Sequence, residues 1–125
     1  MFTGEFIMIY TSYFSSRKYK PEDGVSIARY CKFWKGPVYD KLVPPEYLLS
    51  WWKALSLEEQ LNRDNQEQYR TAYITRVLAQ LNVHEVAKEL DNKVLLCYEK
   101  SADFCHRHII AQWLQNNGYG CTTQQ

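Results

Sequence analysis

The chain lacks the features that mark membrane and secreted proteins. Its longest apolar runs, residues 6–10 and 94–98, are far shorter than the roughly 20 residues that a helix needs to cross a bilayer. Its amino-terminal residues do not form a cationic stretch followed by a long apolar one, as a secretory signal does. These absences predict a cytoplasmic protein without a membrane partner.

Signature motifs of nucleotide and hydrolase chemistry are also missing. The sequence contains no Walker loop, no dinucleotide glycine fingerprint, no G-x-S-x-G and no H-E-x-x-H, so it predicts no bound cofactor. It has no C-x-x-C pair, and its cysteines are scattered, so in a reducing cytosol we expect free thiols and no resident metal. An alternative is a zinc site with three ligands and a fourth from His84, Cys31 or Cys121. The three ligands would be Cys97, Cys105 and His106.

What is present indicates one folded domain over residues 1–125. Hydrophobic residues make up 46% and aromatic residues 15% of the chain, enough to form a core and to exclude a disordered protein. The formal net charge is only +1, but residues 15–45 hold seven Lys or Arg and three acids, a local charge of +4. This basic segment interleaves cations with aromatics, which suits contact with a nucleotide or a nucleic acid.

Short apolar segments alternate with helical patterns. Residues 6–10, 25–29 and 93–98 have the apolar or alternating composition of strands. Helices are predicted over residues 46–55, from Ser56 in a capping box with Glu59, over 65–81 with Asn65 as the cap, from Asn82 to 90, and over 104–116. Helix–strand alternation implies right-handed parallel crossovers. We therefore predict a three-layer, Rossmann-like α/β fold with a small, mostly parallel sheet of three or four strands flanked by helices.

Reactive side chains follow the predicted strands, where ligands collect in parallel sheets. At about 100° per residue, His106 falls inside the apolar face of the last helix, Cys105 and Arg107 fall on its borders, and His108 faces water. Glu99 and Ser12 are the expected hydrogen-bond partners of His106. The candidate catalytic residues are Cys105, His106, Arg107 and Glu99, and the candidate ligand-binding residues are Thr11, Ser12, Tyr13 and Arg29.

The run Cys105-His106-Arg107 combines a thiol, a proton carrier and an anion-binding fork. If Asp103 caps the helix, Cys105 lies in its first turn, where free amides and the helix dipole favour a thiolate or a bound anion. Arg107 adds a planar group suited to phosphate or carboxylate. The alternative is structural: a small buried cysteine, a core histidine with a satisfied hydrogen bond, and an arginine paired with Glu99 or Asp103.

Several segments, in order, resemble the motifs of a bacterial and phage family known as domain of unknown function 488. They are Tyr10-Thr11-Ser12-Tyr13-Phe14, Val25-Ser26-Ile27-Ala28-Arg29, Leu42-Val43-Pro44, Leu95-Leu96-Cys97-Tyr98-Glu99-Lys100 and Phe104-Cys105-His106-Arg107. The resemblance implies an α/β fold with a site between the first strand end and the C-H-R turn, and it supplies no activity. Residues 121–125 lack the apolar strand and acid on which the family tends to end, so a short last strand is expected.

Two functions remain open, and the sequence does not decide whether the protein is an enzyme. In the first, it acts on a phosphate-bearing or nucleotide-like substrate, with Cys105 as nucleophile, His106 as proton carrier, Arg107 as anion clamp and Glu99 orienting His106. In the second, the same turn is a static anion site of a module that binds a nucleotide or a nucleic acid, with residues 17–41 as the contact surface. A further non-enzymatic alternative is binding to a host protein through exposed aromatic residues.

Overall fold

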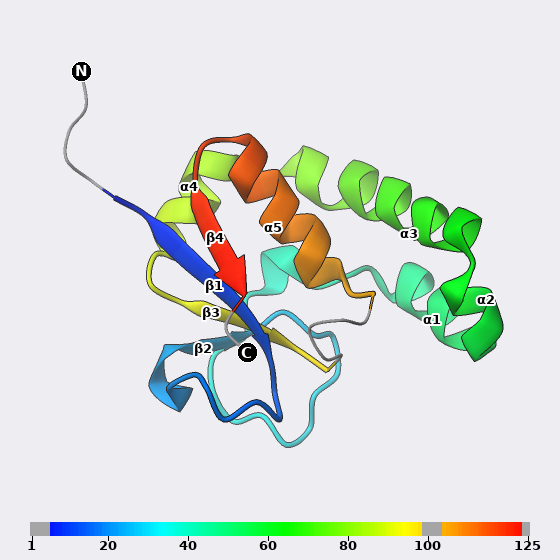
Figure 1. Ribbon diagram of the computed structural model, residues 1–125, viewed down its shortest axis with the longest axis horizontal. Helices are drawn as coiled ribbons and strands as arrows, with labels where there is room; N and C mark the ends of the chain where they lie inside the picture. The colour runs from blue at the N-terminus through cyan, green and yellow to red at the C-terminus, as the bar shows by residue number, and fades with distance from the viewer. Residues whose placement is uncertain (1–5, 99–103, 124–125) are drawn as a thin grey trace.

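The computed structural model describes residues 6–98 and 104–123, which contain a four-stranded sheet. Its strands are β1 (Met8–Tyr13), β2 (Gly24–Ser26), β3 (Val94–Cys97) and β4 (Gly120–Thr123). They lie in the order β2-β3-β1-β4, and every neighbouring pair is parallel. The carboxyl ends of all four strands therefore meet at one edge of the sheet (Figure 1).

Helices cover one face of the sheet. The connection from β2 to β3 contains α1 (Glu46–Ala54), α2 (Leu57–Leu61), α3 (Arg63–Arg76) and α4 (Val83–Glu89), and α5 (His106–Asn116) connects β3 to β4. Both connections cross the sheet in the same direction, so right-handed crossovers place their helices on the same face. Ile9 of β1, Leu95 of β3 and Ile110 of α5 accordingly share one buried core.

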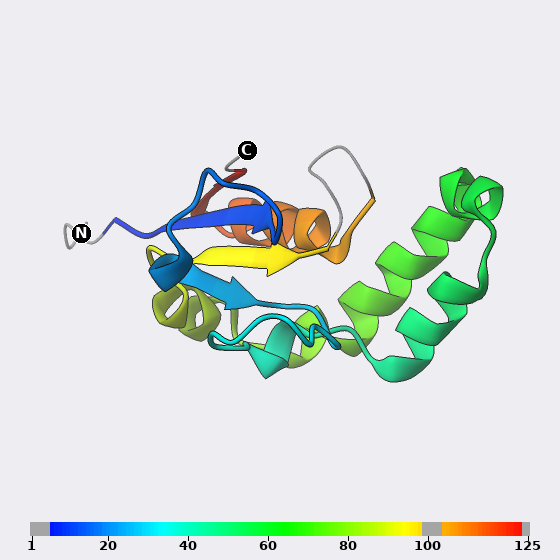
Figure 2. The ribbon, with the colours of Figure 1, turned by 90° about the horizontal axis from the view of Figure 1, so that it is seen from below.

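A loop layer covers the opposite face. The connection from β1 to β2, with the short 3-10 helix η1 (Pro21–Asp23), crosses the sheet in the other direction. Trp34 packs here, because a Cβ atom added at Gly24 would meet both the Trp34 ring and Leu96 Cδ1 at 2.8 Å. Figure 2 shows the same ribbon turned by 90° about the horizontal axis. The predicted three-layer α/β fold with a small parallel sheet is confirmed.

Strand β1 differs from its predicted range of 6–10. It begins at Met8 and continues through Tyr13, because it pairs with β4 over its first half and with β3 over its second half. Thr11 and Ser12 are therefore strand residues with no exposed surface, not part of a loop beyond the strand. Strand β2 ends at Ser26, earlier than predicted, and β4 has the expected short length.

The helices match the predicted ranges except at the ends of α3 and at the start of α5, which begins at His106. The Ser56–Glu59 capping box and the Asn82 cap are present as predicted. Asn62, not Asn65, caps α3, and its side chain accepts hydrogen bonds from the amides of the second and third helical residues. Tyr69 and Tyr73, one helical turn apart, are the buried residues of α3, and the neighbouring Ile74 is 42% exposed.

None of the helices within the described ranges is both long and apolar enough to span a bilayer.

Candidate functional site

The turn from β3 to α5 carries the predicted reactive residues. Cys97 is the last residue of β3, and Cys105 is the N-cap residue of α5, with an extended backbone at φ −156° and ψ 148°. The sequence predicted Cys105 in the first helical turn, but Cys105 lies one position before that turn. Its side chain accepts no hydrogen bond from the amide groups at the start of α5, and the predicted effect of the helix dipole on its sulfur stays a prediction.

Cys97 and Cys105 form a disulfide, and the expectation that all cysteines are free is wrong for this pair. The two cysteines are eight positions apart in the sequence, a spacing that matches no standard disulfide framework. The end of β3 and the start of α5 lie side by side, which places the two sulfurs together. Cys31 and Cys121 are free, and burial raises the pKa of the Cys121 thiol to about 11.

His106 points into the core, as its position on the helical face predicted. Its Nε2–H donates to the Ile27 carbonyl at 2.7 Å, and its Nδ1 lies 3.7 Å from Cys105 Sγ. Its expected partner Ser12 is not involved. Since a carbonyl only accepts, the proton is on Nε2 and the lone pair of Nδ1 faces the cysteine. Burial, together with the charges of Arg107 and His108, lowers the pKa of His106 to about 4, so the ring is neutral at pH 7.

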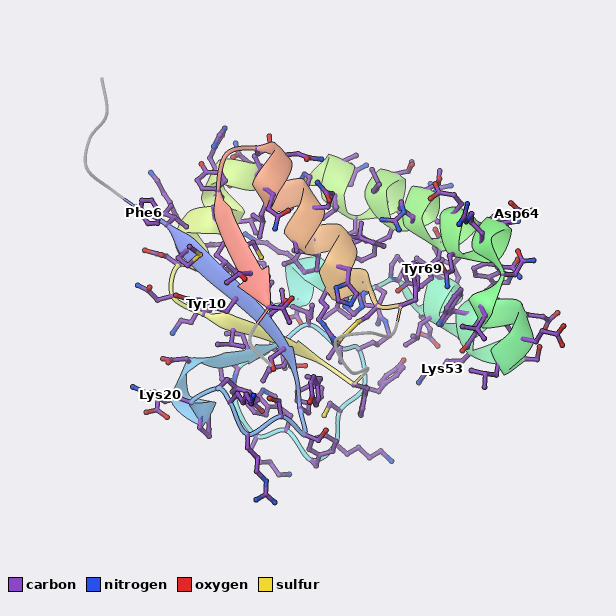
Figure 3. All side chains as sticks on the ribbon, in the orientation of Figure 1. Phe6, Tyr10, Lys20, Lys53, Asp64 and Tyr69 are labelled. Carbon is purple, nitrogen blue, oxygen red and sulfur yellow. A yellow bond between two sulfur atoms is a disulfide. The ribbon has the colours of Figure 1, made fainter. Side chains whose placement is uncertain are left out.

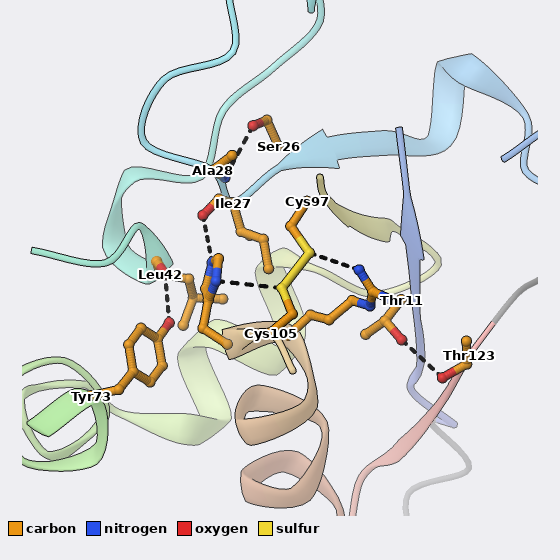
Figure 4. The surroundings of a disulfide bond; sticks show 11 residues. Thr11, Ser26, Ile27, Ala28, Leu42, Tyr73, Cys97, Cys105 and Thr123 are labelled. Atoms are coloured by element: carbon orange, nitrogen blue, oxygen red, sulfur yellow. Dashed lines mark hydrogen bonds between the residues drawn. A yellow bond between two sulfur atoms is a disulfide. The ribbon is translucent and has the colours of Figure 1, made fainter. Parts of the chain in front are cut away.

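Arg107 is completely buried, although the sequence placed it at the border of the helical face. Its Nη1 donates to Cys97 Sγ at 2.8 Å, and its guanidinium carbon lies 6.0 Å from the centre of the Tyr13 ring. In Figure 4 the disulfide lies between Ile27 on one side and Thr11 and Thr123 on the other. Arg107 thus contacts one sulfur of the disulfide, and His106 contacts the other.

The β1 residues lie on both faces of the sheet. Thr11 and Tyr13 share the α5 face with Cys97, and the Thr11 hydroxyl is 3.2 Å from that of Thr123. Ser12 points to the opposite face. Its hydroxyl is buried, and no hydrogen-bond partner for it occurs within residues 6–98 and 104–123. The predicted site is therefore divided by the sheet, with Ser12 apart from the other candidates.

A pocket with a cavity volume of about 50 Å³ adjoins the disulfide at the carboxyl edge of the sheet. Cys105, His106 and Arg29 are among its lining residues, so three of the predicted site residues come together there. Arg29 Nε donates to the Pro44 carbonyl at 2.8 Å, which orients its guanidinium at the wall of the pocket. Thr11, Ser12, Tyr13 and Arg107 are not among the lining residues.

An aromatic wall, which the sequence did not predict, forms one side of this pocket. Trp52 of α1, Tyr69 of α3 and Phe104 are in mutual contact, with ring centres 5.0–5.4 Å apart. Lys53, next to Trp52, adds a second cation to the lining, and Figure 3 labels Lys53 on α1 and Tyr69 on α3. These residues come from three separate segments, so no local pattern pointed to them.

Two predicted partners, Glu99 and Asp103, lie outside the described residues. Their predicted roles, orienting His106 and capping α5, stay predictions. In the part of the chain that the structure describes, no three His, Cys, Asp or Glu side chains gather in an arrangement that could hold a metal ion.

The fold and the site define a small α/β protein with a Cys-His-Arg turn at the carboxyl edge of a parallel sheet. The family model described as the active DUF488-N3 subclade matches residues 9–118. The chain therefore belongs to the DUF488 family, as its motifs indicated. No curated protein and no solved structure matches the chain.

Proposed function

We propose that the protein binds a phosphate-bearing, nucleotide-like ligand in the pocket beside Cys105 and His106. The observation that carries this proposal is the lining of the pocket, which combines an aromatic wall with the cations Arg29 and Lys53. Aromatic rings stack on bases, and each such contact is worth about 1–3 kcal/mol. A guanidinium forms paired hydrogen bonds with phosphate. The pocket thus offers one surface for a base and another for its phosphate.

The start of α5 adds to the anion-binding character of the pocket. Cys105 and His106, both lining residues, stand at the amino end of this 11-residue helix, where backbone amides and the helix dipole favour negative charge. Arg107 lies behind the disulfide and contributes positive charge to the same end of α5. The phosphate is expected between Arg29 and this helix end.

The Cys105–His106 pair provides an enzymatic version of the function. A dithiol reductant would break the disulfide, leaving two thiols and an oxidised reductant. The Cys105 sulfur would then attack the phosphorus of the ligand while its proton passes to His106 Nδ1, which already faces the sulfur. The phosphorus–oxygen bond to the leaving alcohol breaks as the sulfur–phosphorus bond forms, and His106 gives its proton to the leaving oxygen and returns to its neutral form. The pKa of His106, lowered to about 4, favours a neutral thiol and imidazole at rest, so proton transfer would accompany the attack. The description of the matching subclade as active supports this version.

Calorimetric titration with a nucleoside monophosphate tests the binding proposal. We expect Arg29→Gln to weaken binding at least tenfold, because a charged hydrogen bond contributes about 1.5–3 kcal/mol. The parent nucleoside, which has no phosphate, should bind wild type and variant alike. Lys88→Gln removes an exposed cation of α4 that is not in the pocket lining and serves as the control. Equal affinity of wild type and Arg29→Gln for the monophosphate would contradict the proposal.

A binding module without catalysis is the second candidate. The observation that favours it is the disulfide, which occupies the sulfur of Cys105 while the pocket remains formed. Cys105→Ser distinguishes the two candidates. An enzyme should lose turnover and any covalent adduct seen by mass spectrometry, whereas a binding module should keep its affinity for the monophosphate.

A further inference from the structure

An exposed aromatic cluster lies beside the pocket, on the loop layer. The rings of Phe14, Phe33, Trp34 and Tyr98 contact one another with centres 5.3–6.0 Å apart, mostly edge to face. Phe33 is 61% exposed and Tyr98 is 47% exposed. We call these four residues the aromatic platform. The platform exposes flat apolar surface to solvent. The contacts between its four rings hold each ring in position.

The loop that carries the platform is fixed in position. Trp34 Nε1 donates to the Pro37 carbonyl at 2.9 Å, and the Trp34 ring packs closely over Gly24 of β2. The ring also covers Gly36, where an added Cβ would approach it to 2.6 Å. The exposed ring of Phe33 is therefore presented from an anchored support.

Positive charge is concentrated in the chain segment that carries Phe33 and Trp34 of the platform. Residues 15–45 carry a net charge of +4 in a chain whose total is +1, so the rest of the chain is negative. The cations of this segment near the platform in sequence are exposed: Arg17, Lys18, Lys20, Lys32 and Lys35. An apolar surface with this charge fits a polyanion that displays flat apolar groups.

The platform and the pocket share a wall. The Tyr98 hydroxyl donates to the Tyr30 carbonyl, and both tyrosines line the pocket next to Arg29. Tyr30 is itself 55% exposed, and the Arg29 guanidinium lies 6.0 Å from the centre of its ring. A chain molecule with one unit in the pocket would thus place its neighbouring units on the platform.

We infer that the ligand is single-stranded nucleic acid, with one nucleotide in the pocket and its neighbours stacked on Phe33 and Tyr98. This inference rests on the proposed function and names the class of ligand for the same site. The exposed lysines, Lys32 and Lys35 among them, meet the phosphates between stacked bases. A duplex does not fit, because its bases are already stacked on each other and have no face to offer the platform.

Fluorescence anisotropy with labelled oligomers of about ten nucleotides, oligo-U and oligo-dT, tests the inference. We expect either oligomer to bind more tightly than the mononucleotide and more tightly than a duplex of the same length. Phe33→Ala should weaken oligomer binding about tenfold and leave the affinity for the mononucleotide unchanged. The double variant Lys32→Gln/Lys35→Gln should lower the slope of log K against log salt by about 1.4.

Tyr47→Ala, which removes another exposed aromatic residue on α1, is the matched control and should bind like wild type. The inference is overturned if the oligomer binds no more tightly than the mononucleotide, if the duplex binds best, or if Phe33→Ala has no effect. In each of these cases mononucleotide binding still supports the proposed function. If the mononucleotide does not bind either, the proposed function fails, and the inference fails with it.

Discussion

His106 shows how one residue connects the packing of the core with the chemistry of the site. Its ring contacts Tyr73 in the core, hydrogen-bonds the chain after β2, and faces Cys105. The sequence predicted its inward direction, because helical geometry alone fixes which face a residue occupies. The sequence did not predict its partner, because the Ile27 carbonyl is 79 residues away along the chain.

The lowered pKa of His106 predicts a pH-dependent stability. As the pH falls below the ordinary value of 6.5, the unfolded chain takes up a proton on this ring, and the folded chain does not until about pH 4. The free energy of unfolding should therefore fall across this window, by about 3 kcal/mol from this group. His106→Gln keeps a donor for the Ile27 carbonyl but cannot be protonated. Urea unfolding at several pH values should show a flatter profile for the variant.

His108→Gln, which changes a histidine in the same turn, is the control for this experiment and should retain most of the wild-type pH profile. If His106→Gln follows the wild-type profile between pH 4 and 6.5, His106 is not buried in its neutral form.

At the scale of elements, the sequence predicted the type of nearly every helix and strand, and local chemistry explains why. A capping box or a run of apolar residues acts within a few positions, so Ser56 and Asn82 were recognised as caps. The sequence did not predict the cap of α3, because Asn62 directly follows α2. Asn62 is both the C-cap of α2 and the N-cap of α3. Nothing in the local pattern separates Asn62 from Asn65 as the cap.

The disulfide joins two elements, the end of β3 and the start of α5. A covalent link over this short separation should raise the free energy of unfolding by about 2–3 kcal/mol through the loss of entropy in the unfolded chain. Urea unfolding with and without a dithiol reductant measures this difference. We expect a folded protein in both states, because the core surrounding these elements remains.

Cys31→Ser, which changes a free cysteine, should show the same effect of the reductant as wild type. The double variant Cys97→Ser/Cys105→Ser should show none. If wild type is equally stable in both states and non-reducing peptide mapping finds no link between residues 97 and 105, the disulfide assignment is wrong.

At the scale of the whole molecule, the layers and the edge that carries the site follow from the alternation of helices and strands. The pocket does not follow from it, because its lining comes from α1, α3, the chain after β2 and the start of α5. Only the folded arrangement brings Trp52, Tyr69 and Phe104 into contact. The sequence thus identified Arg29, Cys105 and His106 in the pocket lining. It did not identify the aromatic wall on which we propose that a base stacks.

The central claim is that the pocket beside Cys105 and His106 binds the ligand. Chemical-shift mapping by NMR with a nucleoside monophosphate tests it most directly. The largest shifts should occur at Arg29, Tyr30, Cys105 and His106, which line the pocket. Shifts confined to the open groove along α3, lined by Asp64, Glu67 and Arg76, or no shifts at millimolar ligand, would contradict the claim.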